Sequence, residues 1–394
     1  MFDVAQLQEN RGDQVAFFGM DHPDNEPMPY ARHFPTYVEF RAPSMPLRSQ
    51  IRASARMLYS RTAELGIEAV VKDFRPDVVH LHNIYHQLSP SVLRPLARAG
   101  IPSVMTLHDY KLACPTYQFL DHGKLCEACL GGHFYHAATH RCKDDSIAAS
   151  LLAAVESYAH GITRAYSPVH LFIAPSRFLA GKMREAGVFP ERMRLLNHFV
   201  DSGPIAVKMA AGGPFVFAGR LSPEKGVDVL IKAAAHVRDA TVDVLGDGPA
   251  RAELERLSAE VAPGRVRFHG RVDKAAVHAA MRSATAVVLP SRWHENQPMT
   301  ILEAFACGVP VIGTSLGGIP ELISDGVNGY IVPPGEPVAL ASRMGDLSTS
   351  ADLALEMGCK ARALVGAGYT PAHHLQGITE LYAEAGRVVQ PLAV

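Results

Sequence analysis

Short runs of apolar residues alternate with longer amphipathic stretches along almost the whole chain. The apolar runs predict strands at Gln14–Gly19, Asp77–Leu81, Ser103–Leu107, His170–Ala174, Arg194–Leu196, Phe215–Ala218, Thr241–Leu245, Val266–His269, Ala286–Leu289, Val309–Gly313 and Gly329–Val332. Helical stretches of roughly 10 to 20 residues separate most of them. This alternation predicts the α/β class, with parallel sheets that carry helices on both faces.

The alternation stops at residues 197–214, where glycine and proline gather and no period is evident. We therefore expect two doubly wound, Rossmann-like domains, over residues 1–200 and 201–371, followed by a terminal helix within residues 372–394. The first domain carries a cysteine-rich insertion at residues 112–145. Two domains that face each other form a cleft, and clefts between domains are usual ligand sites.

Two carboxylates stand out among the polar positions of the second half. Glu295 lies in a polar loop after the strand Ala286–Leu289, and Glu303 lies eight positions later on an apolar helix that starts near Met299. Backbone N–H groups at a helix start can face a phosphate or hydroxyls, and each carboxylate can accept hydrogen bonds from a vicinal diol. The order of strand, loop and helix therefore predicts a site for a polyhydroxylated, phosphorylated ligand. For Glu303 the alternative is a carboxylate favoured by the helix dipole.

Two cations flank a turn that follows the strand Phe215–Ala218. Arg220 and Lys225 lie between Gly219 and Gly226 at the carboxyl end of that strand, where doubly wound sheets bind their ligands. A guanidinium fork and an ammonium point charge together suit a diphosphate. The alternative interpretation is two surface cations at a turn.

The Gly-Arg-Leu-x-x-x-Lys-Gly turn at residues 219–226 and the Glu-x7-Glu spacing of Glu295 and Glu303 resemble the retaining GT-B glycosyltransferases of family 4. The resemblance covers roughly residues 70–390. It implies a GT-B fold and an enzyme that moves a sugar from a nucleoside-diphosphate sugar (UDP or GDP) to a hydroxyl of a glycan or lipid-linked acceptor. The implied setting is the assembly of cell-surface polysaccharide or glycolipid. The resemblance also implies that the terminal helix crosses back onto the first domain.

One departure from the family concerns the start of the chain. The sequence opens with a predicted helix over Val4–Gly12, so the family's first strand and glycine-rich loop are expected to be missing. Either the true start lies upstream or this protein lacks them. Since that loop usually lies near the donor phosphates and the acceptor, a protein that lacks it is expected to have reduced activity.

The resemblance assigns roles to single residues. Glu295 would contact the donor sugar, Glu303 the ribose, and Arg220 and Lys225 the diphosphate in place of a metal, because the sequence has no Asp-x-Asp motif. No cofactor for catalysis is therefore expected. His108 would reach the transferred sugar from the first domain and complete the predicted catalytic pair with Glu295; a structural histidine is the alternative. The remaining predicted donor-binding residues are Gly246, Gly248, Arg271, Val272, Asn296, Gln297, Met299 and Thr300.

Four of the six cysteines lie in the insertion: Cys114, Cys126, Cys129 and Cys142. The Cys-x2-Cys pair within this set is typical of zinc ligands, and the flanking spacings permit one tetrahedral structural site. A zinc ion would organise a segment that has little core of its own. Reduced thiols packed as small hydrophobes and a disulfide pair are the alternatives, and four nearby histidines could replace a cysteine: His122, His133, His136 and His140.

Composition narrows the partners. The net charge is −1, so the chain lacks the excess of basic residues that is typical of a nucleic-acid-binding protein. Arg48, Arg52 and Arg56 follow an i, i+4, i+8 spacing, so a basic helix could touch anionic lipid, with a solvated helix face as the alternative. No apolar run approaches a membrane span and no signal peptide is evident, so we expect a cytoplasmic protein, or one peripheral at the inner membrane face.

Two other functions fit the same motifs. One is a nucleotide-sugar 2-epimerase, which would not explain the cysteine-rich segment. The other is a nucleotide-sugar-binding protein without turnover, which binding without donor hydrolysis or transfer would identify. A dinucleotide dehydrogenase fits poorly, because no early Gly-x-Gly-x-x-Gly follows a strand.

Overall fold

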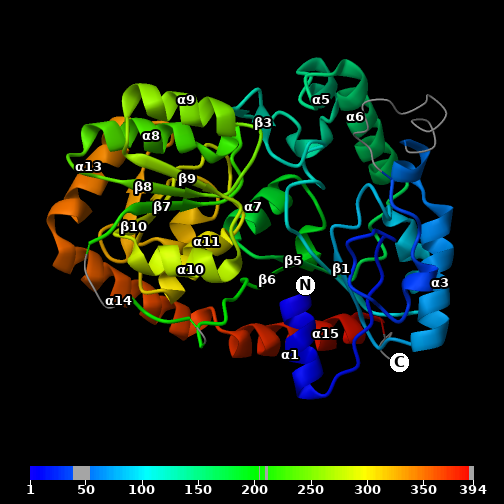
Figure 1. The fold of residues 1–394 in the computed structure, drawn as a ribbon. Helices are drawn as coiled ribbons and strands as arrows, with labels where there is room; N and C mark the ends of the chain where they lie inside the picture. Colours follow the sequence, from blue (N-terminus) through cyan, green and yellow to red (C-terminus); the bar gives the residue numbers. More distant parts are fainter. Residues whose placement is uncertain (39–53, 204, 209–211, 390–394) are drawn as a thin grey trace.

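The computed structural model describes residues 1–38, 54–203, 205–208 and 212–389. Two lobes, each built on a parallel sheet, lie side by side (Figure 1). The two-domain α/β prediction is therefore confirmed, while the predicted domain boundaries stay a prediction. None of the helices in these ranges combines the length and apolar character needed to cross a bilayer.

The first sheet has the strand order β1-β2-β5-β6, and all its pairings are parallel. Its strands are β1 (Val79–His82), β2 (Ser103–Thr106), β5 (Leu171–Ala174) and β6 (Met193–Leu195). The helices of this half are α1 (Phe2–Arg11), α3 (Arg61–Phe74), α4 (Leu93–Arg98), α6 (Ile147–Ile162) and α7 (Arg177–Glu185). Short elements fill the segment between β2 and α6: β3 (Leu120–Asp121), β4 (Lys124–Leu125), η3 (Leu130–Gly132) and α5 (Tyr135–Thr139).

The second sheet has the strand order β12-β11-β10-β7-β8-β9, also parallel throughout. Its strands are β7 (Phe215–Ala218), β8 (Val242–Leu245), β9 (Val266–Gly270), β10 (Ala286–Leu289), β11 (Val311–Thr314) and β12 (Gly329–Val332). Its helices are α8 (Val227–His236), α9 (Arg251–Val261), α10 (Lys274–Ser283), α11 (Met299–Ala306), α12 (Ile319–Leu322), α13 (Pro337–Thr349) and α14 (Ala351–Gly368). All predicted strands of this half are present, with ends shifted by at most two residues.

Both faces of the second sheet are buried except at the edge strand β9, which explains the near-continuous apolar runs of its inner strands. Phe215 and Phe217 of β7 point to the face covered by α8, α9 and α13, whereas Val216 points to the face covered by α10, α11 and α12. Successive residues of a strand point to opposite faces, so each four-residue run supplies both cores.

The last helix, α15 (Pro371–Val389), belongs to the first lobe in space. Its Ile378 and Ala385 pack on Val104, Leu171 and Ile173, which form one face of the first sheet. In Figure 1, α15 runs below the first lobe and meets α1. The crossing back that the resemblance implied is thus present among the described residues.

The predicted strand Gln14–Gly19 was wrong, because this segment has no regular structure. Residues Gln14–Phe18 and the edge strand β1 both line one cavity of about 590 Å³, and the described residues form no ladder between them. Phe18 instead packs into the core of the first lobe. An apolar run becomes a strand only where a neighbouring strand can accept its backbone hydrogen bonds.

Candidate active site

The strand order of the second sheet reverses between β10 and β7. From β7 the chain proceeds to β8 and β9 on one side, and from β10 to β11 and β12 on the other. Ligands of doubly wound sheets bind outside the carboxyl ends of the strands at such a switch point. The turn after β7 carries Arg220 and Lys225, and the loop after β10 carries Glu295. Topology therefore brings the two predicted motifs to one place.

Close backbone approach locks these two loops together. Gly226 has φ +68°, and a Cβ there would lie 2.0 Å from the carbonyl oxygen of Pro290. The backbone N–H of Arg292 donates to the carbonyl oxygen of Glu224 at 2.8 Å. Only glycine tolerates both this conformation and this contact, so the residue that ends the first motif fixes its distance to the second.

The Glu295 side chain is buried and has two partners. Lys225 Nζ lies 2.8 Å from Glu295 Oε1, and the Ser291 hydroxyl donates to the same oxygen at 2.7 Å. The Lys225 ammonium also lies 5.0 Å from the ring centroid of Trp293, within cation–π range. The site thus holds a cation and a carboxylate side by side, suited to a diphosphate and to sugar hydroxyls respectively.

A second glycine pair shapes the loop that carries Glu295. A Cβ at Gly317 would lie 2.1 Å from the Glu295 carbonyl oxygen, and one at Gly318 would lie 1.8 Å from that of Asn296. The Gly318 N–H donates to the Glu295 carbonyl at 2.7 Å. Sequence reasoning missed this contact between the two glycines and the loop that carries Glu295. The local signal that could have indicated it is the Gly-Gly dipeptide just before α12.

The other predicted turns of the second domain gather around the same edge. A Cβ at Gly246 would lie 1.9 Å from the Gly219 carbonyl oxygen, and one at Gly248 would lie 2.2 Å from that of Leu221, so the turn after β8 packs on the Arg220 turn. Arg220 is exposed, as are Arg271 and Val272, which follow β9.

Helix α11 begins at Met299, as predicted, so Glu295 to Pro298 lie in the loop and Glu303 lies one turn into the helix. Met299 is exposed and Thr300 is half-buried at the helix start. Burial raises the pKa of Glu303, and the charge of Lys274 opposes this shift. A carboxylate that is costly to desolvate gains from hydrogen-bond donors such as ribose hydroxyls.

The first domain meets this loop directly. Asn296 Nδ2 donates to the Leu107 carbonyl oxygen at 3.3 Å, and the Tyr110 hydroxyl donates to that of His294 at 3.1 Å. The backbone N–H of His198 donates to Gln297 Oε1 at 2.5 Å. His108, which follows Leu107, is therefore placed across from the loop that carries Glu295. Gln297 Nε2 is buried and makes no hydrogen bond with the described residues, so it remains a donor for a ligand.

His108 lies in a row of half-buried histidines that sequence reasoning did not anticipate. Its Nε2 lies 2.9 Å from Nδ1 of His82, and its ring stacks on that of His198 with centroids 5.6 Å apart. Burial lowers the pKa of His108 to about 4 and that of His198 to about 3. His108 is therefore neutral at pH 7, able to exchange hydrogen bonds with a sugar hydroxyl but not to act as an acid.

The residues just after His108 have structural partners. Lys111 is buried, and its ammonium lies 2.8 Å from Glu156 Oε2. The Asp109 carboxylate accepts the backbone N–H of Lys111 at 2.9 Å. These contacts hold the loop after β2 in place beside the site.

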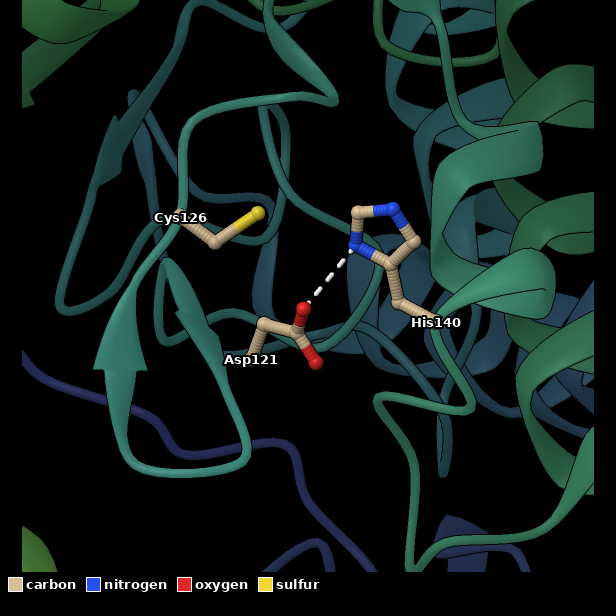
Figure 2. A group of neighbouring side chains, drawn as sticks. All are labelled: Asp121, Cys126 and His140. Carbon is tan, nitrogen blue, oxygen red and sulfur yellow. Dashed lines mark ion pairs between the residues drawn. The ribbon is translucent and has the colours of Figure 1, made fainter.

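The four predicted cysteine ligands lie in the segment between β2 and α6, where Cys114 and Cys129 are buried and Cys126 and Cys142 are half-buried. Within the described ranges, the donor atoms that lie within 4.8 Å of one another belong to Asp121, Cys126 and His140 (Figure 2). The cysteine-only zinc site stays a prediction.

The predicted lipid-facing arginines are only partly described. Arg48 and Arg52 lie outside the described residues. The Arg56 guanidinium donates to the carbonyl oxygens of Thr36 at 2.6 Å and Gln87 at 3.2 Å, so it is engaged within the first domain.

Comparison with known proteins matches both halves of the chain to sugar-transfer families. Residues 213–350 match the family model described as "Glycosyl transferases group 1". Among curated proteins, the chain is 33% identical over 223 residues to a D-inositol 3-phosphate glycosyltransferase of Streptomyces scabiei, covering 48% of this chain and 50% of that protein. It is 32% identical over 176 residues to an alpha-D-kanosaminyltransferase of Streptomyces kanamyceticus, covering 43% and 45% of the two chains. The matched part thus spans about half the length of these relatives.

Solved structures show the same architecture. HepE of Anabaena, solved in complex with UDP, superposes with a TM-score of 0.63 at 21% identity, over 81% of this chain and 82% of that one. Sucrose-phosphate synthase of Thermosynechococcus elongatus superposes with a TM-score of 0.70 at 20% identity, over 98% and 92% of the chains. At this level of identity the likeness shows the GT-B fold. Residues 1–203, more than half of the chain, match the model of "Glycosyltransferase Family 4", and the chain belongs to that family.

Proposed function

We propose that this protein transfers a sugar from a nucleoside-diphosphate sugar to an acceptor hydroxyl with retention of configuration. The observation that carries the proposal is the Lys225–Glu295 pair, with its 2.8 Å contact at the switch point of the second sheet. It sets a diphosphate-binding cation beside a sugar-binding carboxylate, opposite the loop that carries His108.

In the proposed reaction, the bond between the anomeric carbon and the diphosphate oxygen breaks. The acceptor hydroxyl oxygen joins that carbon on the same face, and the hydroxyl proton passes to a departing phosphate oxygen. Arg220 and Lys225 stabilise the charge that develops on the diphosphate, which is the largest contribution such a site offers. Glu295 and neutral His108 orient the sugar hydroxyls, and Glu303 binds the ribose.

UDP or GDP is the proposed nucleotide. The UDP bound to HepE supports the nucleotide class, although the 21% identity between the two chains carries only the fold. The proposed acceptor is a glycan or lipid-linked sugar of the cell surface, and contact with the inner membrane face through Arg48 and Arg52 belongs to the same proposal. Its support is the family resemblance and the basic spacing of that segment.

A binding panel tests the donor site. Thermal shifts would be measured for UDP, GDP, ADP and their common sugar conjugates, with EDTA present, on the wild-type chain and on the double variant R220A/K225A. We expect one base to give a shift that the double variant loses. No shift with any nucleotide would refute the donor site. Binding without release of nucleoside diphosphate in the presence of glycan acceptors would favour a binding protein, and a donor recovered with an inverted C2 would favour an epimerase.

A further inference from the structure

The insertion between β2 and α6 is a segment with little regular structure of its own. It contains two-residue strands β3 and β4, one turn of η3 and the five-residue helix α5 (Figure 1). Several of its side chains are nevertheless buried, among them Cys114, Phe119 and Cys129. Short elements supply few hydrogen bonds and little apolar area, so an additional cross-link would stabilise the segment strongly.

One group in this segment has the composition and spacing of a metal site. Figure 2 shows Asp121 at the end of β3, Cys126 just after β4 and His140 just after α5, with their side chains directed toward one another. A sulfur, a carboxylate oxygen and an imidazole nitrogen from these three residues all lie within 4.8 Å of one another. Tetrahedral zinc with bonds of about 2.0–2.3 Å sets its ligand atoms about 3.3–3.8 Å apart, so a small adjustment of side chains would accommodate the ion.

The His140 imidazole gives an independent indication. Its Nδ1 atom is buried and makes no hydrogen bond with the described residues, although Asp121 Oδ2 lies only 3.1 Å away. Thus the two atoms are close without the alignment of a hydrogen bond. Two ligands of one ion lie near each other in this way without a hydrogen bond between them.

The surroundings resemble the outer shell of a metal site. His122 Nδ1 lies 2.6 Å from Asp121 Oδ1, the carboxylate oxygen other than the one facing His140. The backbone N–H of Cys126 donates to the Phe119 carbonyl oxygen at 2.8 Å, which fixes the turn that carries the thiol. Partners that orient ligands in this way are a regular part of protein metal sites.

We propose that Asp121, Cys126 and His140 bind one zinc ion as three of its four ligands. A set of one sulfur, one nitrogen and one oxygen donor suits a borderline-soft divalent ion, of which zinc is the usual choice in proteins. The site differs from a cysteine-only set, because it requires His140 and Asp121.

Side-chain contacts link the proposed zinc site to the loop that carries Glu295. Glu127, next to Cys126, has Oε1 3.6 Å from His294 Nε2 and Oε2 2.7 Å from Lys182 Nζ. His294 precedes Glu295. Zinc therefore anchors a contact between the insertion and the second domain, and its role is structural.

Metal analysis tests the ligand set. The full chain would be purified in reductant, reconstituted with zinc sulfate, dialysed and analysed by mass spectrometry for metal. About one zinc per chain is expected in the wild type and in the controls His133→Ala and Cys359→Ser, and about a tenth or less in Cys126→Ser and His140→Ala. His140→Cys should recover the metal, because a thiolate also binds zinc.

Cobalt gives a second readout that does not depend on activity or on the yield of a single variant. Cobalt-loaded wild-type protein should show a thiolate-to-cobalt charge-transfer band, which Cys126→Ser weakens and His133→Ala leaves unchanged. A wild-type chain with less than about a fifth of one zinc after reconstitution would overturn the proposal. Full zinc in His140→Ala and Asp121→Asn together with loss in Cys114→Ser would overturn it in favour of the four-cysteine set.

Discussion

Lys225 of the turn after β7 and Glu295 of the loop after β10 form an ion pair of 2.8 Å, although 70 positions separate them in the chain. Two glycines make this contact geometrically feasible, Gly226 on one side and Gly317 on the other. The pair joins the diphosphate part of the proposed site to its sugar part. The two residues can therefore be tested separately, by comparing a free nucleoside diphosphate with the matching nucleotide sugar.

Replacing Lys225 tests the diphosphate contact. Lys225→Ala should weaken the binding of free UDP or GDP and of the matching nucleotide sugar by about 10- to 100-fold, since a hydrogen bond to a charged group contributes about 1.5–3 kcal/mol. Titration calorimetry measures both. Lys232→Ala, an exposed lysine of α8, is the control and should bind as wild type. Unchanged affinity in Lys225→Ala would remove this residue from the phosphate site.

Replacing Glu295 separates sugar from phosphate. Glu295→Gln keeps the shape of the side chain but weakens its hydrogen bonds to sugar hydroxyls, so the nucleotide sugar should lose more affinity than the free nucleoside diphosphate. The ratio of the two dissociation constants is the measurement. Equal losses for both ligands would argue against a sugar contact.

The glycines behind Glu295 offer a test of the loop geometry. In Gly318→Ala the new methyl group would collide with the Asn296 carbonyl oxygen, which must move together with the neighbouring carboxylate. Donor binding should fall at least about tenfold, a cost of about 1.4 kcal/mol. Gly345→Ala, in helix α13 with open space around the position, should bind as wild type and unfold at the same or a higher temperature. Wild-type donor affinity in Gly318→Ala would show that the loop tolerates the shift.

Half-buried histidines of the first domain predict a particular pH dependence. Burial lowers the pKa values of His80, His108 and His198 to about 3 to 4, below the ordinary value of 6.5. Between pH 6.5 and 4 the unfolded chain therefore binds more protons than the folded chain, and the free energy of unfolding falls as the pH falls. Each histidine contributes up to about 1.4 kcal/mol per pH unit.

Urea unfolding at pH 7, 6 and 5 measures this slope. His80→Asn should make the slope shallower by up to about 1.4 kcal/mol per pH unit, whereas His133→Asn, at an exposed position, should leave it unchanged. An identical slope in His80→Asn would mean that His80 is accessible to protons in the folded state.

The buried pair of Lys111 and Glu156 should stabilise the loop that carries His108. Burial raises the pKa of Glu156, but the hydrogen bond from His86 and the charge of Lys111 outweigh this effect and bring the pKa down to about 2. Lys111→Met leaves a buried carboxylate short of a partner and should lower the free energy of unfolding by about 3 kcal/mol. Lys72→Met, at a surface pair, should change it by less than about 0.5 kcal/mol. Comparable effects of the two variants would mean that the buried pair is not needed.

Local patterns were enough to predict the strands of both sheets, because most of the short apolar runs lie between long helical stretches and the inner strands are buried on both faces. They also singled out Lys225 and Glu295, which the structure brings into contact, since each stands in a compact motif after a strand. Ser291, Gly317 and His82 were missed, because their roles come from contacts with residues distant in the sequence. The segment Gln14–Gly19 has strand composition, but its pairing depends on a neighbour that its own residues do not encode.

The return of α15 to the first lobe has a consequence for biosynthesis. One face of the first sheet is covered by Ile378 and Ala385, which leave the ribosome only after the entire second domain has been made. The strands β2 and β5 must therefore remain partly exposed while translation continues, and domains otherwise tend to fold in the order of their synthesis. A chain arrested before Pro371 would present Val104, Leu171 and Ile173 to solvent, where chaperones recognise apolar surface.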